Sequence, residues 1–301
     1  MILAVASGKG GTGKTTVATN LARCLGSRAQ LIDCDVEEPN AHLFLKPVME
    51  RVSEVTLPVP EVDLSRCTYC GQCSEFCRFS AIVVVGRQLL SFPEMCHGCG
   101  GCSLVCPEKA IGESPRVLGV LEEGVADGVA FVHGRLRVGE AMSPPLIRAA
   151  RRLAMADRTV ILDAPPGTSC PVITAVRDTD YCVMVTEPTP FGINDLMLAV
   201  EVVRSLGVPH GVVVNRSDLD SEELHKLCRK EGLPILLEIP EDRRIAEAYS
   251  KGQMIVDVYP EYRWEFLKLF QRIRIDLAKA EARRGRLRTG AGDDTCPRNS
   301  S

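Results

Sequence analysis

The chain has 301 residues, of which 45% are hydrophobic and 25% charged, a composition typical of a globular protein with apolar material for one large or two smaller domains. Its formal net charge of −3 gives no general attraction to nucleic acid or acidic lipid, and no apolar run approaches the roughly 18–20 residues of a membrane span. The opening MILAVASGKG has neither a basic leader nor a small-residue cleavage site, so we expect a cytoplasmic protein without nucleic-acid or membrane contact.

The first predicted elements are a buried strand at Met1–Ala6, a glycine-rich loop, and a helix from about Lys14 to Leu25. The loop satisfies the phosphate-loop pattern G-x-x-x-x-G-K-T in the strand-to-helix context that this motif requires. Backbone amides of such a loop cradle phosphates, Lys14 would neutralise the β- and γ-phosphate oxygens, and Thr15 would coordinate Mg²⁺. The alternative is a glycine-rich turn without a ligand. The predicted ATP-binding residues of the loop are Gly8, Gly10, Gly11, Thr12, Gly13, Lys14, Thr15 and Thr16.

A cysteine-rich block interrupts the pattern from about Pro58 to about Pro115, after a short strand at Gln30–Asp33. Two runs share the spacing C-x2-C-x2-C-x3-C and form an internal repeat typical of a two-cluster ferredoxin. In such tandem runs three cysteines of one run bind a 4Fe-4S cluster together with the fourth of the other run. The spacing therefore predicts two 4Fe-4S clusters, one on Cys67, Cys70, Cys73 and Cys106 and one on Cys96, Cys99, Cys102 and Cys77.

Two other interpretations of the cysteines stay open. The chain has 14 cysteines, which could form a disulfide framework, but the regular spacing and the lack of an export signal favour metal binding in a reducing compartment. A zinc ribbon could use any two CxxC pairs, although eight cysteines in two equal runs favour clusters. Arg78 follows Cys77 where the pattern usually has proline, which affects a local turn and not the ligand.

After the block, strands and helices alternate, which predicts a doubly wound, mostly parallel α/β sheet covered on both faces. The strand Val160-Ile-Leu-Asp163 ends in an acid, as a Walker B strand should. We expect strands at 131–138, 159–162, 181–186, 211–214 and 235–238. We expect helices from Ser143 to about Met155, near 172–177, 194–206 and 222–230, and at about 261–282. The predicted organisation is a P-loop NTPase domain in two parts, 1–57 and 116–282, an inserted ferredoxin-like domain at 58–115, and a disordered tail at 283–301.

Six segments closely resemble the MinD/ParA superfamily of ATPases, which includes Mrp-type and nitrogenase-iron-protein-type members. They are SGKGGTGKTT (Ser7–Thr16), DCDVEEPN (Asp33–Asn40), DAPPGTS (Asp163–Ser169), TEPTP (Thr186–Pro190), VVNR (Val213–Arg216) and EIPED (Glu238–Asp242). The chain is most similar to MinD-like ATPases that carry an inserted ferredoxin domain.

The resemblance implies an ATP-dependent homodimer in which Lys9 reaches the phosphates of the partner's nucleotide, in the manner of an arginine finger. Asp35 matches the acid that positions the attacking water, and Asn215 matches the asparagine that recognises adenine. Asp33 and Asp163 match acids of the Mg²⁺ shell; for Asp33, a helix-capping or strand-end carboxylate is the alternative. The expected catalytic residues are Lys9, Lys14, Asp35 and Asp163, with Thr15 and Asp33 at the metal.

Three functions are consistent with this combination of motifs. We expect a Mg²⁺-dependent ATPase whose two 4Fe-4S clusters couple nucleotide state to electron transfer or to docking of a redox or iron–sulfur partner protein. The alternatives are an Mrp-type carrier for iron–sulfur cluster assembly, and a MinD/ParA-like spatial organiser with a redox-sensing insert. Cys170 lies where the nitrogenase iron protein has a cluster cysteine, but no second cysteine lies between Pro107 and Ser169, which favours a packed or switch II thiol.

Overall fold

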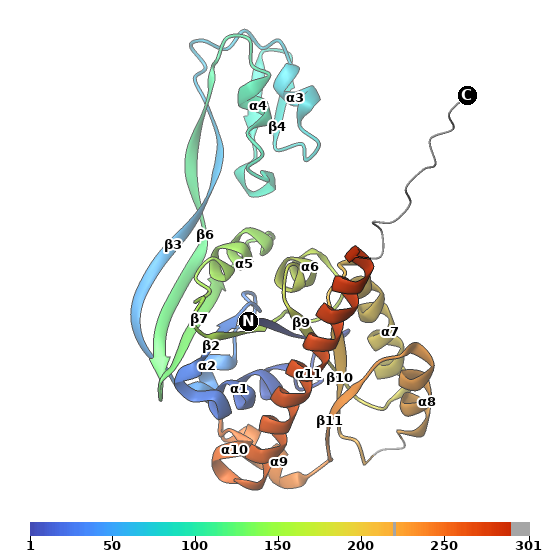
Figure 1. Ribbon diagram of the computed structural model, residues 1–301. Helices are drawn as coiled ribbons and strands as arrows, with labels where there is room; N and C mark the ends of the chain where they lie inside the picture. The colour runs from blue at the N-terminus through green and yellow to red at the C-terminus, as the bar shows by residue number, and fades with distance from the viewer. Residues whose placement is uncertain (219–220, 290–301) are drawn as a thin grey trace, which may run out of the picture.

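The structure, a computed structural model, describes residues 1–218 and 221–289 (Figure 1). Within these residues nine strands form one sheet in the order β11-β10-β9-β1-β8-β2-β7-β6-β3. The first seven strands in this order run parallel, and β6 and β3 are added antiparallel at one edge. The parallel strands are β1 (Ile2–Ala6), β2 (Ala29–Asp33), β7 (Val129–Leu136), β8 (Thr159–Asp163), β9 (Tyr181–Thr186), β10 (His210–Asn215) and β11 (Ile235–Ile239). The expected α/β fold with a mostly parallel sheet is confirmed.

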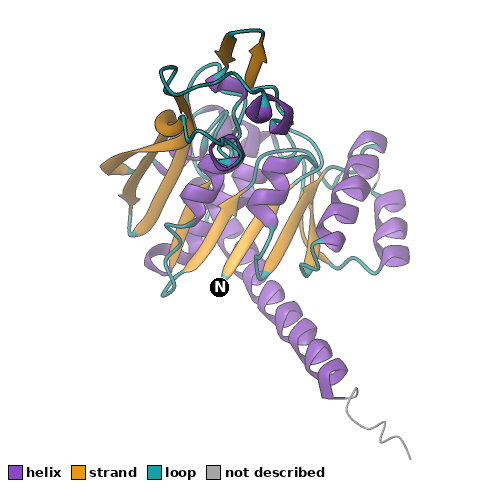
Figure 2. Cartoon of the chain, turned by 90° about the horizontal axis from the view of Figure 1, so that it is seen from above, coloured by secondary structure: helices purple, strands orange, loops and turns teal. Residues whose placement is uncertain are grey.

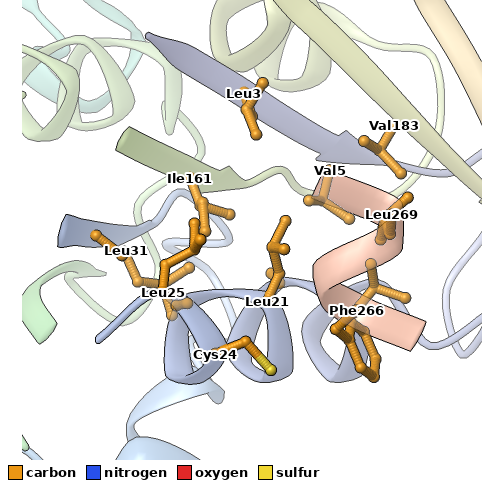
Figure 3. Packing of buried hydrophobic residues seen from close by; sticks show 14 of the residues in the cluster. Leu3, Val5, Leu21, Cys24, Leu25, Leu31, Ile161, Val183, Phe266 and Leu269 are labelled. Atoms are coloured by element: carbon orange, nitrogen blue, oxygen red, sulfur yellow. The ribbon is translucent and has the colours of Figure 1, made fainter. Parts of the chain in front are cut away.

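Two hydrophobic cores lie on opposite faces of this sheet, because successive side chains of a strand point to opposite sides. Leu3 and Val5 of β1 belong to one core, and Ala4 and Ala6 to the other. Figure 3 shows Leu21 and Leu25 of one helix and Phe266 and Leu269 of another packed on the first face.

Helices cover both faces, as the view in Figure 2 shows. The first core is covered by α1 (Lys14–Leu25), α2 (Ala41–Leu45), α10 (Ile255–Val258) and α11 (Glu261–Thr289). The second is covered by α5 (Pro144–Arg151), α6 (Cys170–Val176), α7 (Pro190–Ser205) and α8 (Glu222–Glu231). The short α9 (Arg243–Ser250) and the 3-10 turn η1 (Gly26–Arg28) complete the body of the molecule.

A long two-stranded ribbon leaves the sheet at its edge. It consists of β3 (Val48–Val62) and β6 (Ile111–Ala126), which pair antiparallel from Val48 opposite Val125 to Val62 opposite Ile111. Residues 119–126 of β6 also pair with β7, whereas the β6–β7 ladder does not extend to residues 111–118, which pair with β3. Figure 1 shows the ribbon carrying the cysteine-rich residues away from the sheet. The expected domain boundaries at 57/58 and 115/116 fall inside β3 and β6, and both strands continue through them without a break.

The lobe at the end of the ribbon comprises residues 63–110 and repeats one backbone pattern twice. It contains α3 (Gln72–Phe76), the hairpin β4 (Ile82–Val85) and β5 (Gln88–Ser91), the 3-10 turn η2 (Pro93–Met95) and α4 (Gly101–Leu104). Left-handed backbone conformations recur in pairs separated by the same number of residues as Cys67 and Cys96: Tyr69 with Gly98, Gly71 with Gly100, and Ser80 with Lys109. The internal sequence repeat is thus also a repeat of local structure.

Two helix ends differ from the sequence-based expectation. Helix α5 ends at Arg151 and not near Met155. Helix α11 continues past Ala282 to Thr289, through a segment with four arginines and a leucine, which favour helix, and one glycine, which does not. The rest of the expected disordered tail, 290–301, lies outside the described residues. No helix that the structure describes is long and apolar enough to span a membrane.

Candidate functional site

The glycine-rich loop lies between the end of β1 and the start of α1. Its last residue before the helix, Gly13, adopts a φ of 94°, a conformation that residues with a Cβ rarely take. A Cβ at Gly13 would also lie 2.6 Å from Nδ2 of Asn215. Lys14 follows as the first residue of α1, and its side chain is buried among Asp163, Asp35 and Asp33. Burial lowers the pKa of Lys14, and the three carboxylates oppose that change.

Asp163 at the end of β8 is buried, and neither of its oxygens has a hydrogen-bond partner among the described residues. Burial raises the pKa of this carboxyl to about 7. The neighbouring Thr15 hydroxyl and Lys14 ammonium act in the opposite direction, although Thr15 does not complete a hydrogen bond of normal geometry. A buried, unpartnered carboxylate beside a hydroxyl is a donor set that suits a hard cation with oxygen ligands such as Mg²⁺.

Asp33 lies directly opposite Asp163 in the sheet but has different contacts. Its oxygens accept hydrogen bonds from the backbone N–H groups of Asp35 (3.0 Å), Asn40 (3.1 Å) and Ala41 (3.0 Å). Burial and the charge of Asp163 raise the pKa of Asp33. This geometry agrees with the strand-end carboxylate that the sequence left as an alternative, because Asp33 holds the loop from Asp35 to Ala41 in place.

Asp35 is half-buried and lies near Lys14, whose charge offsets part of the rise in pKa that burial gives to the Asp35 carboxyl. Asp35, Asp33, Asp163 and Lys14 therefore form one cluster at the carboxyl ends of β2 and β8. This is the edge of a parallel sheet where α/β proteins usually bind ligands.

Lys9 and Asn215 make contacts within their own chain. The Lys9 ammonium lies 3.8 Å from the carboxylate of Glu187, which also contacts the Arg216 guanidinium at 3.3 Å. The Asn215 side-chain amide donates to the backbone oxygen of Thr12 at 2.9 Å. The sequence did not single out Glu187 as a site residue, although the TEPTP segment contains it.

The eight cysteines of the lobe line two cavities. One cavity is lined by Cys67, Cys70, Cys73 and Cys106, and the other by Cys77, Cys96, Cys99 and Cys102. Each set takes three cysteines from one run and one from the other, as the crossed spacing predicts. No three His, Cys, Asp or Glu side chains of the described residues are placed to hold a single metal ion. Four thiols around a cavity suit a larger group that bridges them.

Backbone N–H groups point at several of these sulfurs. Ala81 donates to Cys77 Sγ at 3.3 Å, and Ala110 donates to Cys106 Sγ at the same distance. Gly98 donates to Cys96 Sγ at 3.4 Å. Such bonds stabilise negative charge on the sulfurs, so the cavities fit anionic thiolate-bound 4Fe-4S clusters. Phe79 and His97 stack with ring centroids 3.5 Å apart beside the second cavity, a contact that no sequence motif indicates.

A second unpredicted group joins the loop after Asp33 to the ribbon. The rings of His42 and His133 are in contact, with centroids 5.0 Å apart. The Nε2 atom of His133 lies 2.6 Å from the carboxylate of Glu122 on β6. No sequence motif marks these residues, since the pairing of β6 with β7 places Glu122 opposite His133 and His42 comes from α2. Cys170 is exposed at the start of α6 and belongs to neither cysteine cavity.

This chain shares a family and a fold with known proteins. Residues 3–255 match the CobQ/CobB/MinD/ParA nucleotide binding domain. An uncharacterized protein of Methanocaldococcus jannaschii, MJ0579, is 31% identical over 264 residues, which cover 84% of this chain and 90% of that protein. A protein of Pyrococcus horikoshii named iron-sulfur cluster carrier protein is 26% identical over 272 residues, which cover 84% of this chain and 78% of that protein. The structure of the septum site-determining protein MinD with Mg-ADP from Pyrococcus horikoshii superimposes with a TM-score of 0.55 at 20% identity, covering 89% of this chain and 93% of that one.

Proposed function

The chain belongs to the CobQ/CobB/MinD/ParA nucleotide-binding family, and from this premise we propose that it is a Mg²⁺-dependent ATPase that carries two 4Fe-4S clusters. Its nucleotide state would govern electron transfer by the clusters or their docking to a partner protein. The observation that carries this proposal is the division of eight cysteines into two cavities, at the end of a ribbon that leaves the edge of the same sheet that carries the nucleotide loop.

The residues of the nucleotide site suit ATP hydrolysis. The amides of the Gly8–Thr16 loop and the Lys14 ammonium would bind the phosphates. Thr15 and Asp163 would hold Mg²⁺, which neutralises phosphate charge when bound. Asp35 would orient the attacking water, since its carboxylate lies within the electrostatic reach of Lys14. Asp33 would act indirectly, by fixing the loop that carries Asp35.

A homodimer would complete the site. Lys9 is about one-third exposed, so its ammonium would reach a nucleotide held by a second subunit once it leaves Glu187. A cation supplied by a partner stabilises the charge that develops on the transferred phosphoryl group. Asn215, beside the glycine-rich loop, is the proposed contact to adenine.

The cysteine sets would each hold one cluster. Cys67, Cys70, Cys73 and Cys106 would bind the first, and Cys77, Cys96, Cys99 and Cys102 the second. When bound, such clusters supply single-electron transfer. The amides of Ala81, Gly98 and Ala110 would stabilise the thiolates.

A carrier function in iron–sulfur cluster assembly is the second candidate, because relatives at 26–27% identity bear that name. Against it, the eight cavity cysteines already complete two sets of four, which suits clusters that stay on the protein. A carrier would pass a cluster to an apo-acceptor at a rate that depends on ATP. An electron-transfer protein would keep its iron and sulfide through such an incubation.

The test of the cluster proposal is anaerobic purification followed by iron and acid-labile sulfide analysis and EPR, with and without ATP. We expect about eight iron and eight sulfide per chain. Cys67→Ser should remove one cluster and leave the other mostly intact. Cys170→Ser, which changes an exposed cysteine outside both cavities, is the matched control. Stoichiometric zinc with negligible sulfide would refute the proposal.

A further inference from the structure

Glu187 is a buried acid at the nucleotide site with two cationic neighbours. Its side chain is only 8% exposed, yet it contacts Lys9 at 3.8 Å and Arg216 at 3.3 Å. The loop that carries it is fixed, because the hydroxyl of Thr186 donates to the oxygen of Gly192 and the hydroxyl of Thr189 accepts from the amide of Gly192. The position of the carboxylate is thus set by the fold after β9, whereas Lys9 reaches it through a flexible side chain.

We propose that Glu187 is a positioning residue that holds the Lys9 ammonium at its own subunit until a second copy of the chain presents a nucleotide. Lys9 then exchanges the carboxylate of Glu187 for the phosphates of the partner's ATP. This inference rests on the proposed function, because it assumes that Lys9 acts across the dimer.

Because Glu187 has two cationic neighbours, the loss of one of them has a small electrostatic cost. A buried carboxylate that loses its only partner is strongly destabilised. Glu187 keeps Arg216 when Lys9 leaves, so its charge stays compensated. The contact with Lys9 is the longer of the two, and Lys9 is 35% exposed, so solvent screens this pair more than a fully buried one.

Glu187 also shifts the monomer–dimer equilibrium toward the monomer. Because Lys9 must leave Glu187 before it can bind a partner's phosphate, the ion pair opposes association by its own free energy. An exposed or partly exposed ion pair of this kind changes an equilibrium by about two- to fivefold. Removing the charge at residue 187 should therefore favour the ATP-bound dimer by that factor.

The first measurement concerns the nucleotide-free monomer. The rate at which an amine-reactive reagent labels Lys9, followed by mass spectrometry, should rise about two- to fivefold in Glu187→Gln. Glutamine keeps the size of the side chain and its hydrogen-bonding oxygen. Glu201→Gln, which changes an exposed acid of α7, is the matched control and should leave the labelling of Lys9 unchanged. Equal Lys9 labelling in the wild type and Glu187→Gln would overturn the inference.

The second measurement is a double-mutant cycle on the full chain. Sedimentation with a slowly hydrolysed ATP analogue gives the protein concentration at half-maximal dimer for the wild type, Glu187→Gln, Lys9→Ala and the double variant. We expect Glu187→Gln to lower that concentration about two- to fivefold in the wild-type background and to have no effect when Lys9 is absent. An equal effect in both backgrounds refutes positioning through Lys9. If Lys9→Ala alone forms dimers and hydrolyses ATP like the wild type, the proposed trans role of Lys9 fails instead.

Discussion

At the scale of single residues, Asp163 is the group whose ionisation should respond most to Mg²⁺. Its carboxyl has a pKa of about 7 in the folded protein, against an ordinary value of 3.8, and burial is the main cause. Between these pH values the folded state binds more protons than the unfolded chain, so the contribution of Asp163 to stability falls as pH rises through this window. Bound Mg²⁺ favours the ionised form and therefore releases a proton near neutral pH.

Asp163→Asn should separate stability from activity. At pH 8 the nucleotide-free variant should melt about 3 °C or more above the wild type, since each kcal/mol is worth roughly 2–4 °C in a domain of this size. The advantage should shrink at pH 5, where folded Asp163 is protonated. Mg²⁺-dependent ATPase activity should be lost at both pH values. Calorimetry and a phosphate-release assay check this, and a pH-independent difference in melting temperature would contradict it.

At the scale of elements, the ribbon is joined to the body by a buried ion pair. Arg116 of β6 pairs with Glu140, which lies in the loop between β7 and α5 and also accepts from the amide of Met142 at 3.1 Å. The Glu140 side chain is 1% exposed. The guanidinium of Arg137, which is half-exposed, lies 3.9 Å from the same Glu140 carboxylate. The pair lies just beyond the end of the β6–β7 ladder, where the ribbon leaves the sheet.

Breaking this pair from one side should destabilise the ribbon root strongly. Arg116→Met leaves the Glu140 carboxylate buried with only distant compensation, which should lower the free energy of unfolding by about 3 kcal/mol. Arg116→Met combined with Glu140→Met should lose less, because no buried charge then lacks a partner. Urea denaturation measures both variants, and iron content shows whether the lobe is retained. A single variant as stable as the wild type would disprove the role of the pair.

The elements show which parts of the structure the sequence could predict. The strand at Met1–Ala6, the glycine-rich loop and α1 follow from local pattern, as does the pairing of cysteine sets from their spacing. The ribbon could not be predicted in this way. Its strands β3 and β6 are separated in sequence by the whole cysteine-rich lobe, and they expose apolar residues such as Val48 and Val52. The contacts of Lys9 with Glu187 and of His42 with His133 arise only from tertiary placement.

At the scale of the whole molecule, a continuous set of contacts connects the nucleotide site with the lobe. Asp33 holds the amides of Asn40 and Ala41, and His42 follows directly in α2. His42 contacts His133, which bonds to Glu122 on β6. The same β6 strand continues to the lobe. A γ-phosphate that orders the loop around Asp35 therefore acts on a segment in direct contact with the root of the ribbon.

We expect nucleotide state and cluster potential to be coupled through this path. Binding free energies are reciprocal, so if ATP shifts a cluster potential, reduction must shift ATP affinity by the same free energy. Couplings of about 1–3 kcal/mol are typical, and about 1.4 kcal/mol corresponds to roughly 60 mV for a one-electron couple. Redox titration by EPR, with and without a slowly hydrolysed ATP analogue, measures the shift. ATP affinity of the oxidised and reduced protein measures its reciprocal.

His133→Phe tests whether the ribbon root carries this coupling. Phenylalanine keeps an aromatic ring beside His42 but removes the bond to Glu122, so the ATP-induced shift in potential should shrink while cluster content and ATP binding persist. His225→Phe, on α8 at the far end of the sheet, is the matched control and should keep the full shift. A shift that survives in His133→Phe would place the coupling elsewhere in the fold. Identical potentials with and without nucleotide in the wild type would leave ATP to control partner docking alone, since docking needs no change in the clusters themselves.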